Sequence, residues 1–196
     1  SGVFCMTLAK KLITIPFDGN NKGCLVTFAT KDVHSSYPDG LNDPEVSRFL
    51  VTVHDQPQTL STIKNFVESN YNSIDSLLFA IKVENEVNPI GTIRLHAIEF
   101  FNYSAHIGLC IFNKKYWGKG IGSAAINALT KWSFTELGLR WLEAGIYEDN
   151  FGSRKAFEKA NYKLSHKIAD KYLFNGQPQT VNVFVAKNEN WMKRVI

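Results

Sequence analysis

Residues 113–125 read NKKYWGKGIGSAA and place three glycines, Gly118, Gly120 and Gly122, at alternate positions. A strand-like segment precedes this stretch and a helical pattern follows it, so the glycines mark a turn from a strand into a helix. Glycine reaches positive φ at no steric cost and lets a ligand approach the main chain closely. The amides of such a turn, together with the helix N-terminus, favour an anion such as the phosphate of a cofactor.

Two well-known phosphate loops do not fit this stretch. The chain contains no GxxxxGK[ST] sequence, which excludes a Walker loop. A dinucleotide fingerprint needs GxGxxG, and residues 118–123 lack the third glycine because Ser123 stands there. A tight strand-to-helix turn that binds no ligand remains the alternative at this point.

The composition indicates one soluble globular domain. The chain has 196 residues, of which 44% are hydrophobic and 20% charged. No segment reaches the length of a membrane span, and no signal peptide is apparent. The net charge of +4 is too small to indicate a nucleic-acid partner, although Lys114, Lys115 and Lys119 cluster near the glycines. These lysines form either a solvated face or an attraction for a phosphorylated ligand.

The cysteines indicate a reducing compartment. Cys5, Cys24 and Cys110 are odd in number, far apart in sequence and without a CxxC pair. This spacing favours free thiols over disulfides or a zinc site. We therefore expect a cytoplasmic protein that uses no metal.

Hydrophobic periodicity and turn signals predict an α+β fold. Residues 1–22 end in a turn cluster and are expected to be an N-terminal extension, a tag remnant plus a leader strand, before a single domain over 23–196. The expected strands cover residues 24–29, 77–83, 90–98, 105–112, 142–147, 162–168 and 181–186, and the expected helices begin at Asp43 or cover 59–71, 120–137 and 151–160. The prediction is a mostly antiparallel mixed sheet of about seven strands flanked by about four helices.

The segment YWGKGIGSAA resembles the acyl-CoA pyrophosphate loop of the GNAT N-acetyltransferase superfamily, whose pattern is [QR]-x-x-G-x-[GA]. Gly120 and Gly122 match this pattern, whereas Trp117 stands where glutamine or arginine is commonest. The tyrosine-tryptophan-glycine form is similar to the branch of ribosomal-protein N-terminal (alanine/serine) acetyltransferases. A plain turn is less favoured once the other matches are added.

Three further segments resemble the same branch in the same order. LNDPEVSRFL is similar to its first helix, and ADKYLFNGQPQTVNVFVAKN to its last hairpin. In WLEAGIYEDNFGSRKAFEKANYKL, Asn150, Ser153 and Tyr162 match, while Asn161 replaces the usual glycine. The resemblance covers roughly residues 24–188 and implies a GNAT-like fold with a splayed central strand pair at the CoA site.

The resemblance also implies the residues that bind acetyl-CoA. The pyrophosphate would lie on the loop amides, and the pantetheine arm would pair with the strand before the loop, where Gly108 fits a close approach. Asn150 would hydrogen-bond the same arm, although an asparagine before a helix is also a common cap. The implied cofactor-binding residues are Leu109, Cys110, Ile111, Trp117, Gly118, Lys119, Gly120, Ile121, Gly122, Ser123, Asn150 and Ser153.

The catalytic residues implied by the resemblance are His106, Ser153 and Asp170. Ser153, through water, is the candidate proton donor to the departing thiolate, because the tyrosine that many relatives use is replaced by Phe157. His106 is the first candidate general base, since an imidazole suits proton transfer near neutral pH. Asp170, where the branch has a carboxylate, is the second. Also open are Glu143, which fits a structural role, His96 and Glu99.

The expected function is transfer of an acetyl group from acetyl-CoA to a primary amine by direct attack, with no covalent enzyme intermediate. The acceptor is expected to be a protein N-terminal α-amine, an amino sugar including a nucleotide-linked one, or another small amine. The alternative is a non-catalytic acyl-CoA-binding regulator, for which the departures at Phe157 and Asn161 leave room. We expect no nucleic-acid or membrane partner and leave both a monomer and a homodimer open.

Overall fold

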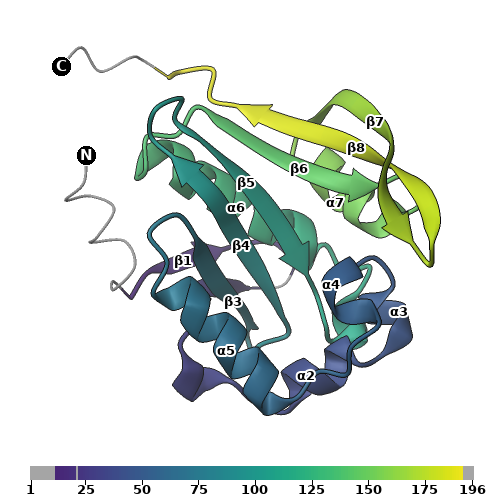
Figure 1. Cartoon of the computed structure of the whole chain (residues 1–196). Coiled ribbons are helices and arrows are strands. Elements are labelled where there is room, and N and C mark those ends of the chain that lie inside the picture. The colour runs from purple at the N-terminus through teal and green to yellow at the C-terminus, as the bar shows by residue number, and fades with distance from the viewer. Residues whose placement is uncertain (1–11, 21, 192–196) are drawn as a thin grey trace.

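The computed structural model describes residues 12–20 and 22–191, and Cys5 lies outside them. Their strands form one mixed sheet in the order β1-β2-β3-β4-β5-β6-β8-β7 (Figure 1). The strands are β1 (Thr14–Phe17), β2 (Gly23–Thr27), β3 (Leu77–Val83), β4 (Gly91–Glu99), β5 (Ser104–Cys110), β6 (Trp141–Tyr147), β7 (Lys163–Phe174) and β8 (Gln177–Lys187). The helices are α2 (Ser36–Leu41), α3 (Pro44–Ser47), α4 (Val51–His54), α5 (Leu60–Tyr71), α6 (Ile121–Thr135) and α7 (Phe151–Lys159), with 3-10 turns η1 (Thr30–Asp32) and η2 (Lys114–Tyr116).

The predicted α+β class and the mostly antiparallel sheet are confirmed. The described part of the chain has one strand more than expected, and this strand is β1. Its register pairs Ile15 with Leu25 of β2, and Ile13, Ile15 and Phe17 are buried in the core. The leader strand expected within residues 1–22 thus belongs to the sheet, while the tag remnant expected before it lies outside the described residues.

Two hydrophobic cores cover the two faces of the sheet. On one face, α6 and α7 pack Leu129 and Phe157 against residues such as Leu142. On the other face, α2 and α5 pack Tyr37 and Val67 against β3. Figure 1 shows α5 and α6 on opposite sides of the sheet. Successive strand residues point to opposite faces, so this arrangement fixes which side chains of β5 and β6 face each layer.

The helix boundaries follow capping signals in the sequence. Asp43 caps α3, as predicted, by accepting a hydrogen bond from the amide of Glu45 at 2.9 Å. Thr59 and Thr62 form a capping box at the start of α5. Asn161, after α7, has φ of 64°, and asparagine is the side chain that best tolerates this left-handed conformation. The replacement of glycine at this position therefore leaves the turn intact.

Strands β5 and β6 are the one parallel pair in the described sheet, and they separate partway along. Their pairing covers only Ser104–Trp141, Ala105–Leu142 and His106–Glu143. Beyond His106, β5 continues to Cys110 on β4, and β6 continues to Tyr147 on β8. The predicted splay of the central strands is thus present and begins directly after His106. Among the described residues, no helix is both long and apolar enough to cross a membrane.

Candidate active site

The glycine loop links the open end of β5 to α6. Gly118 and Gly120 have φ of 70° and 79°, so both need the conformational freedom of glycine. A Cβ added to either would meet no heavy atom within 4 Å, which means that their outer side is open. Gly122 is different, because its Cβ would lie 3.1 Å from Leu109 Cδ2. Gly122 therefore serves the close packing of α6 on β5.

The N-terminus of α6 lies at this loop, with Gly120 as its N-cap. Helix geometry leaves the first amides of α6 without an intrahelical acceptor, and the helix dipole adds a partial positive charge there. The Ser123 hydroxyl donates to the Gly120 carbonyl at 3.0 Å and so helps to hold the loop. The Ser123 hydroxyl, predicted to bind the cofactor, thus stabilises the conformation of the loop.

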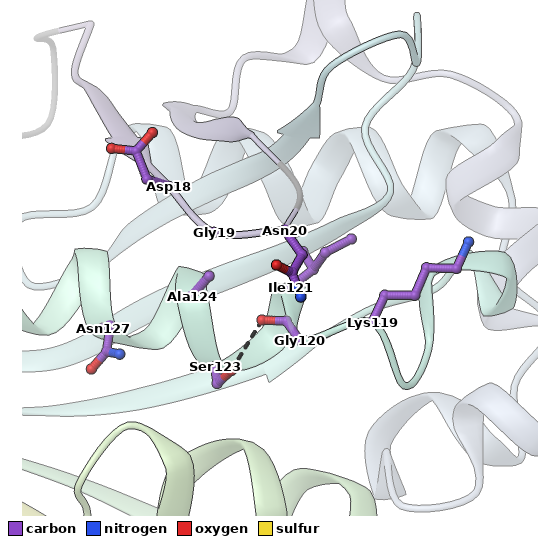
Figure 2. A pocket seen from close by; sticks show the side chains of 9 residues that line it. All are labelled: Asp18, Gly19, Asn20, Lys119, Gly120, Ile121, Ser123, Ala124 and Asn127. Atoms are coloured by element: carbon purple, nitrogen blue, oxygen red, sulfur yellow. Dashed lines mark hydrogen bonds between the residues drawn. The ribbon is translucent and has the colours of Figure 1, made fainter.

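A cavity of about 340 Å³ adjoins the loop (Figure 2). It lies between residues 18–20, which follow β1, and the first two turns of α6, where Ser123 and Asn127 line it. Lys119 and Gly120 form part of its wall. No residue of β5 or β6 lines this cavity, so it neighbours the loop and lies apart from the opening between those strands.

Trp117 ties the loop to the end of β5. Its indole Nε1 donates to the carbonyl of Ile111 at 2.8 Å. Ile111, one of the predicted pantetheine contacts, lies one residue beyond the end of β5. The Lys119 ammonium lies 5.3 Å from the ring centroid of Tyr116, whose hydroxyl donates to Glu86 at 2.8 Å. These contacts hold the loop between the end of β5 and the turn that joins β3 to β4.

Leu109 and Cys110 end β5 at the opening, on opposite faces of the sheet. Leu109 packs against the α6 core, and Cys110 packs against the α2 and α5 core. Burial raises the pKa of the Cys110 thiol to about 12, so this cysteine is a protonated thiol at neutral pH. Cys110 therefore serves as a packing residue at this end of β5.

Asn150 and Ser153 meet at the start of α7. The Asn150 side-chain oxygen accepts a hydrogen bond from the Ser153 amide at 3.3 Å, so the capping role is present. The amide nitrogen of the Asn150 side chain is a separate donor that this cap does not use. Phe157 is buried against Tyr162 at a centroid distance of 5.0 Å. It is a core residue, and Ser153 is the half-buried polar side chain in this turn.

His106 and Glu143 form a pair where the two strands begin to separate. The His106 Nε2 lies 3.2 Å from a Glu143 carboxylate oxygen, and the two side chains are 45% and 30% exposed. The other Glu143 oxygen accepts from the Trp141 indole at 3.1 Å. The His96 ring stacks on the His106 ring at 5.2 Å between centroids. The imidazole of His106 is thereby held between a carboxylate and a second ring.

His96 is a neutral neighbour of this pair. Burial lowers the pKa of His96 to about 4, and Arg94 and His106 add to the effect. Between about pH 6.5 and 4 the unfolded chain therefore protonates at His96 while the folded chain does not, so stability falls as pH falls through this window.

Replacing His96 by glutamine should reduce this pH dependence. Between pH 7 and 4.5 we expect the free energy of unfolding of His96→Gln to fall by roughly 1 kcal/mol less than that of the wild type, because solvent screens the partly exposed ring. Urea unfolding at the two pH values measures the difference. His166→Gln, at an exposed histidine of β7, is the control. An equal fall for the wild type and His96→Gln would contradict the assignment.

Asp170 lies in a different part of the sheet. It is exposed in β7 at a register shift between Ile168 and Tyr172, with φ of 54°. Through β8, Ile168 is level with Tyr147, which is four residues beyond Glu143 on β6. The pairing thus does not bring Asp170 level with His106, and its role in proton transfer stays a prediction.

Two glycines keep the opening free of side chains. Gly108 on β5 and Gly145 on β6 each follow a member of the His106–Glu143 pair by two residues and so lie on the same face. A Cβ on Gly108 would meet no heavy atom within 4 Å, whereas a Cβ on the exposed Gly145 would lie 3.3 Å from Val181 Cγ1. Sequence reasoning noted Gly108 and missed Gly145, whose only signal is a glycine at one of the non-buried positions of the alternating strand β6.

This fold and site define a known class of protein. The sequence pattern of the acetyltransferase (GNAT) domain matches residues 24–163, which is most of the chain. The chain therefore belongs to the GNAT acetyltransferase family, and the predictions of this family and of an acyltransferase enzyme are confirmed.

Individual relatives of the chain are also acetyltransferases by name. The chain is 26% identical over 145 residues to "Uncharacterized N-acetyltransferase YoaA" of Bacillus subtilis (strain 168), covering 73% of this chain and 81% of that protein. Two solved structures share the fold. RimL, a ribosomal L7/L12 α-N-protein acetyltransferase in complex with coenzyme A, has a TM-score of 0.71 at 17% identity, covering 89% of this chain and 98% of RimL. Microcin C7 self-immunity acetyltransferase MccE, in complex with acetyl-CoA and AMP, has 0.71 at 18%, covering 87% and 94%.

Proposed function

We propose that the chain transfers the acetyl group of acetyl-CoA to a primary amine that enters through the opening between β5 and β6. The observation that carries this proposal is the splay itself: beyond His106, the main chain of β5 lacks pairing with β6. An unpaired strand edge is a template for another extended chain, and the pantetheine arm with its amides is such a chain.

The glycine loop suits the pyrophosphate of the same molecule. Gly118 and Gly120 are open on their outer side, and the N-terminal amides of α6 supply donors for phosphate oxygens. Lys119, which lines the neighbouring cavity, adds a positive charge close to this site. The Asn150 side-chain nitrogen is a further donor for the pantetheine arm. We therefore propose that acetyl-CoA extends from the glycine loop at α6 to the opening between β5 and β6.

His106 is the proposed general base. An acceptor amine arrives as an ammonium, and its nitrogen needs a free electron pair to attack the thioester carbon. The His106 imidazole accepts that proton at a ring nitrogen, and Glu143 at 3.2 Å stabilises the imidazolium that forms. Asp170, which lies farther along β7, is the less favoured base.

Ser153 is the proposed proton donor to the departing thiolate. It is half-buried in the first turn of α7, and its hydroxyl makes no hydrogen bond to any of the described residues. The sulfur then leaves as a thiol rather than as a thiolate. A water molecule between the hydroxyl and the sulfur serves the same purpose.

The names of the two structural relatives suggest two acceptor classes. RimL acts on a protein α-amine, and MccE was solved with AMP beside acetyl-CoA. The acceptor of this chain is accordingly a protein N-terminal α-amine, a nucleotide-linked amine such as an amino sugar, or another small amine. We favour an enzyme over a non-catalytic acyl-CoA-binding regulator because His106 and Glu143 are preassembled at the opening.

A thiol-release assay with an acceptor panel tests this function. The wild type should release CoA only when an accepted amine is present, and acetylated product should appear in equal amount. In Ser153→Ala we expect kcat to fall about 10- to 100-fold while acetyl-CoA affinity stays within about threefold, because the lost group acts on the leaving sulfur.

Ser165→Ala, at an exposed serine of β7, is the matched control and should keep full activity. If acetyl-CoA binds but no amine in the panel accelerates CoA release, the regulator alternative replaces the enzyme.

A further inference from the structure

An aromatic cluster lies at the end of β6, beyond the point where β5 and β6 separate. It consists of Phe49, His54, Tyr147, Tyr172 and Phe174. The Phe49 ring stacks with Tyr147 at 6.1 Å and contacts Phe174 at 6.2 Å, measured between centroids. Phe174 also contacts His54 at 5.3 Å, and Tyr147 contacts Tyr172 at 6.1 Å. The cluster thus joins the α3–α4 segment to β6 and the β7–β8 hairpin, which lie side by side in Figure 1.

The cluster is on the same face of the sheet as the proposed base. Tyr147 follows Glu143 by four residues on β6, so both side chains point to one face. At a rise of about 3.3 Å per residue, the two positions are about 13 Å apart. Gly145 lies between them and adds no side chain. A ligand of this length can therefore place an amine at His106 and its other end on the rings.

The rings are open to a ligand rather than sealed in the core. Tyr172 is 43% exposed, and Phe49, Tyr147 and Phe174 are half-buried. Burial raises the pKa of Tyr147, and the nearby Tyr172 adds to this effect. The Tyr147 hydroxyl therefore stays neutral at physiological pH. Exposed flat rings of this kind stack well with other planar groups.

Two cations border the cluster. The Arg48 guanidinium lies 5.0 Å from the Phe49 ring centroid, and the Lys171 ammonium lies 5.2 Å from that of Tyr172. Within the described residues, neither cation has a carboxylate partner within 4 Å, whereas the nearby Lys167 is paired with Glu148. The rings are thus accompanied by uncompensated positive charge, which attracts an anion and repels a polycation.

From these observations we infer the class of the acceptor; the inference rests on the function proposed above. The acceptor is a primary amine joined to a planar, negatively charged group such as a nucleoside phosphate. The nucleobase stacks on the aromatic cluster, and Arg48 and Lys171 bind the phosphate. The amine of the acceptor then reaches His106. A polyamine such as spermidine is disfavoured by the two cations and has no planar group to stack.

Calorimetric titration of AMP into the CoA-loaded protein tests the site directly. Saturating CoA fills the cofactor's own nucleotide site, so any AMP that still binds occupies another one. We expect AMP to bind, and ribose 5-phosphate and adenosine to bind at least about tenfold more weakly, because each lacks one of the two recognised groups.

Variants locate this binding in the cluster. Tyr172→Ala and Lys171→Ala should each weaken AMP binding by about tenfold or more. Leu173→Ala is the matched control, since Leu173 is 60% exposed and directly follows the two test positions in sequence, so this variant should leave AMP affinity unchanged. An absence of AMP binding, or equal affinities in all variants, overturns the inference.

A matched pair of amines separates this inference from the proposed function. N6-(6-aminohexyl)-AMP carries the same alkylamine as hexylamine together with the planar anionic group. We expect its kcat/KM to exceed that of hexylamine by at least about tenfold, with the advantage reduced in Tyr172→Ala. Equal acetylation of both amines contradicts the inferred acceptor class but still supports the proposed acetyltransferase function. Failure to acetylate any amine, with AMP still binding, contradicts the proposed function and leaves the AMP site supported.

Discussion

A Gly120→Leu variant should lose acetyl-CoA binding almost completely, with an affinity at least about a hundredfold weaker than that of the wild type. The Gly120 Cβ position is open in the protein alone, with no heavy atom within 4 Å. The leucine side chain would therefore fill the space in front of the loop amides, where we place the pyrophosphate. Calorimetric titration with acetyl-CoA measures the loss.

Gly138→Leu provides the matched control for backbone strain. Gly138 also has a positive φ, 66°, and its Cβ would also meet no atom within 4 Å, but it follows the opposite end of α6. Both variants pay about 1–2 kcal/mol for an unfavourable backbone conformation, which thermal unfolding can compare. If Gly138→Leu lost binding to the same extent, or if Gly120→Leu kept it, the loop would not be the pyrophosphate site.

Removal of the proposed base should produce the largest loss of turnover. In His106→Ala we expect kcat to fall by about 10²- to 10⁴-fold, the usual contribution of a positioned proton acceptor. Acetyl-CoA affinity should change by less than about threefold, because the imidazole lies beside Glu143 and away from the loop. Initial rates of CoA release and calorimetric titration of the same preparations give both quantities.

Glu143→Gln tests how the base is held. In the wild type a Glu143 carboxylate oxygen lies 3.2 Å from His106 Nε2. The glutamine keeps a polar group at this position but removes the negative charge that stabilises the imidazolium. We expect kcat to fall less than in His106→Ala, and the pH of half-maximal kcat to change. A wild-type pH profile in Glu143→Gln would show that the carboxylate is structural. Full activity in His106→Ala would move the base to Asp170 or to water.

The cofactor loop could be predicted from sequence because its determinants are local. Positive φ at Gly118 and Gly120, a helix beginning directly afterwards and a preceding strand all leave signals within a few residues. The caps of α3 and α5 were predictable for the same reason. Strand β1 was only anticipated as a leader, since four residues carry little periodic signal and its place depends on pairing with β2.

The reacting end of the site depends on contacts that no short segment encodes. His106 and Glu143 are far apart in the chain, and only the parallel register of β5 and β6 brings them within 3.2 Å. The aromatic cluster likewise needs the α3–α4 segment, β6 and β7 to converge. Glu143 looked structural and Tyr147 was unnoticed in the sequence, because the residues that give them a function come from other elements.

Titration of acetyl-CoA into the purified wild-type protein tests the central claim most directly. If the glycine loop and the splay bind this co-substrate, a single site with micromolar affinity, about −8 kcal/mol, should be observed. CoA should compete for the same site. A folded protein that binds neither acetyl-CoA nor CoA would contradict the proposed function, and the three glycines would then form a plain turn between β5 and α6.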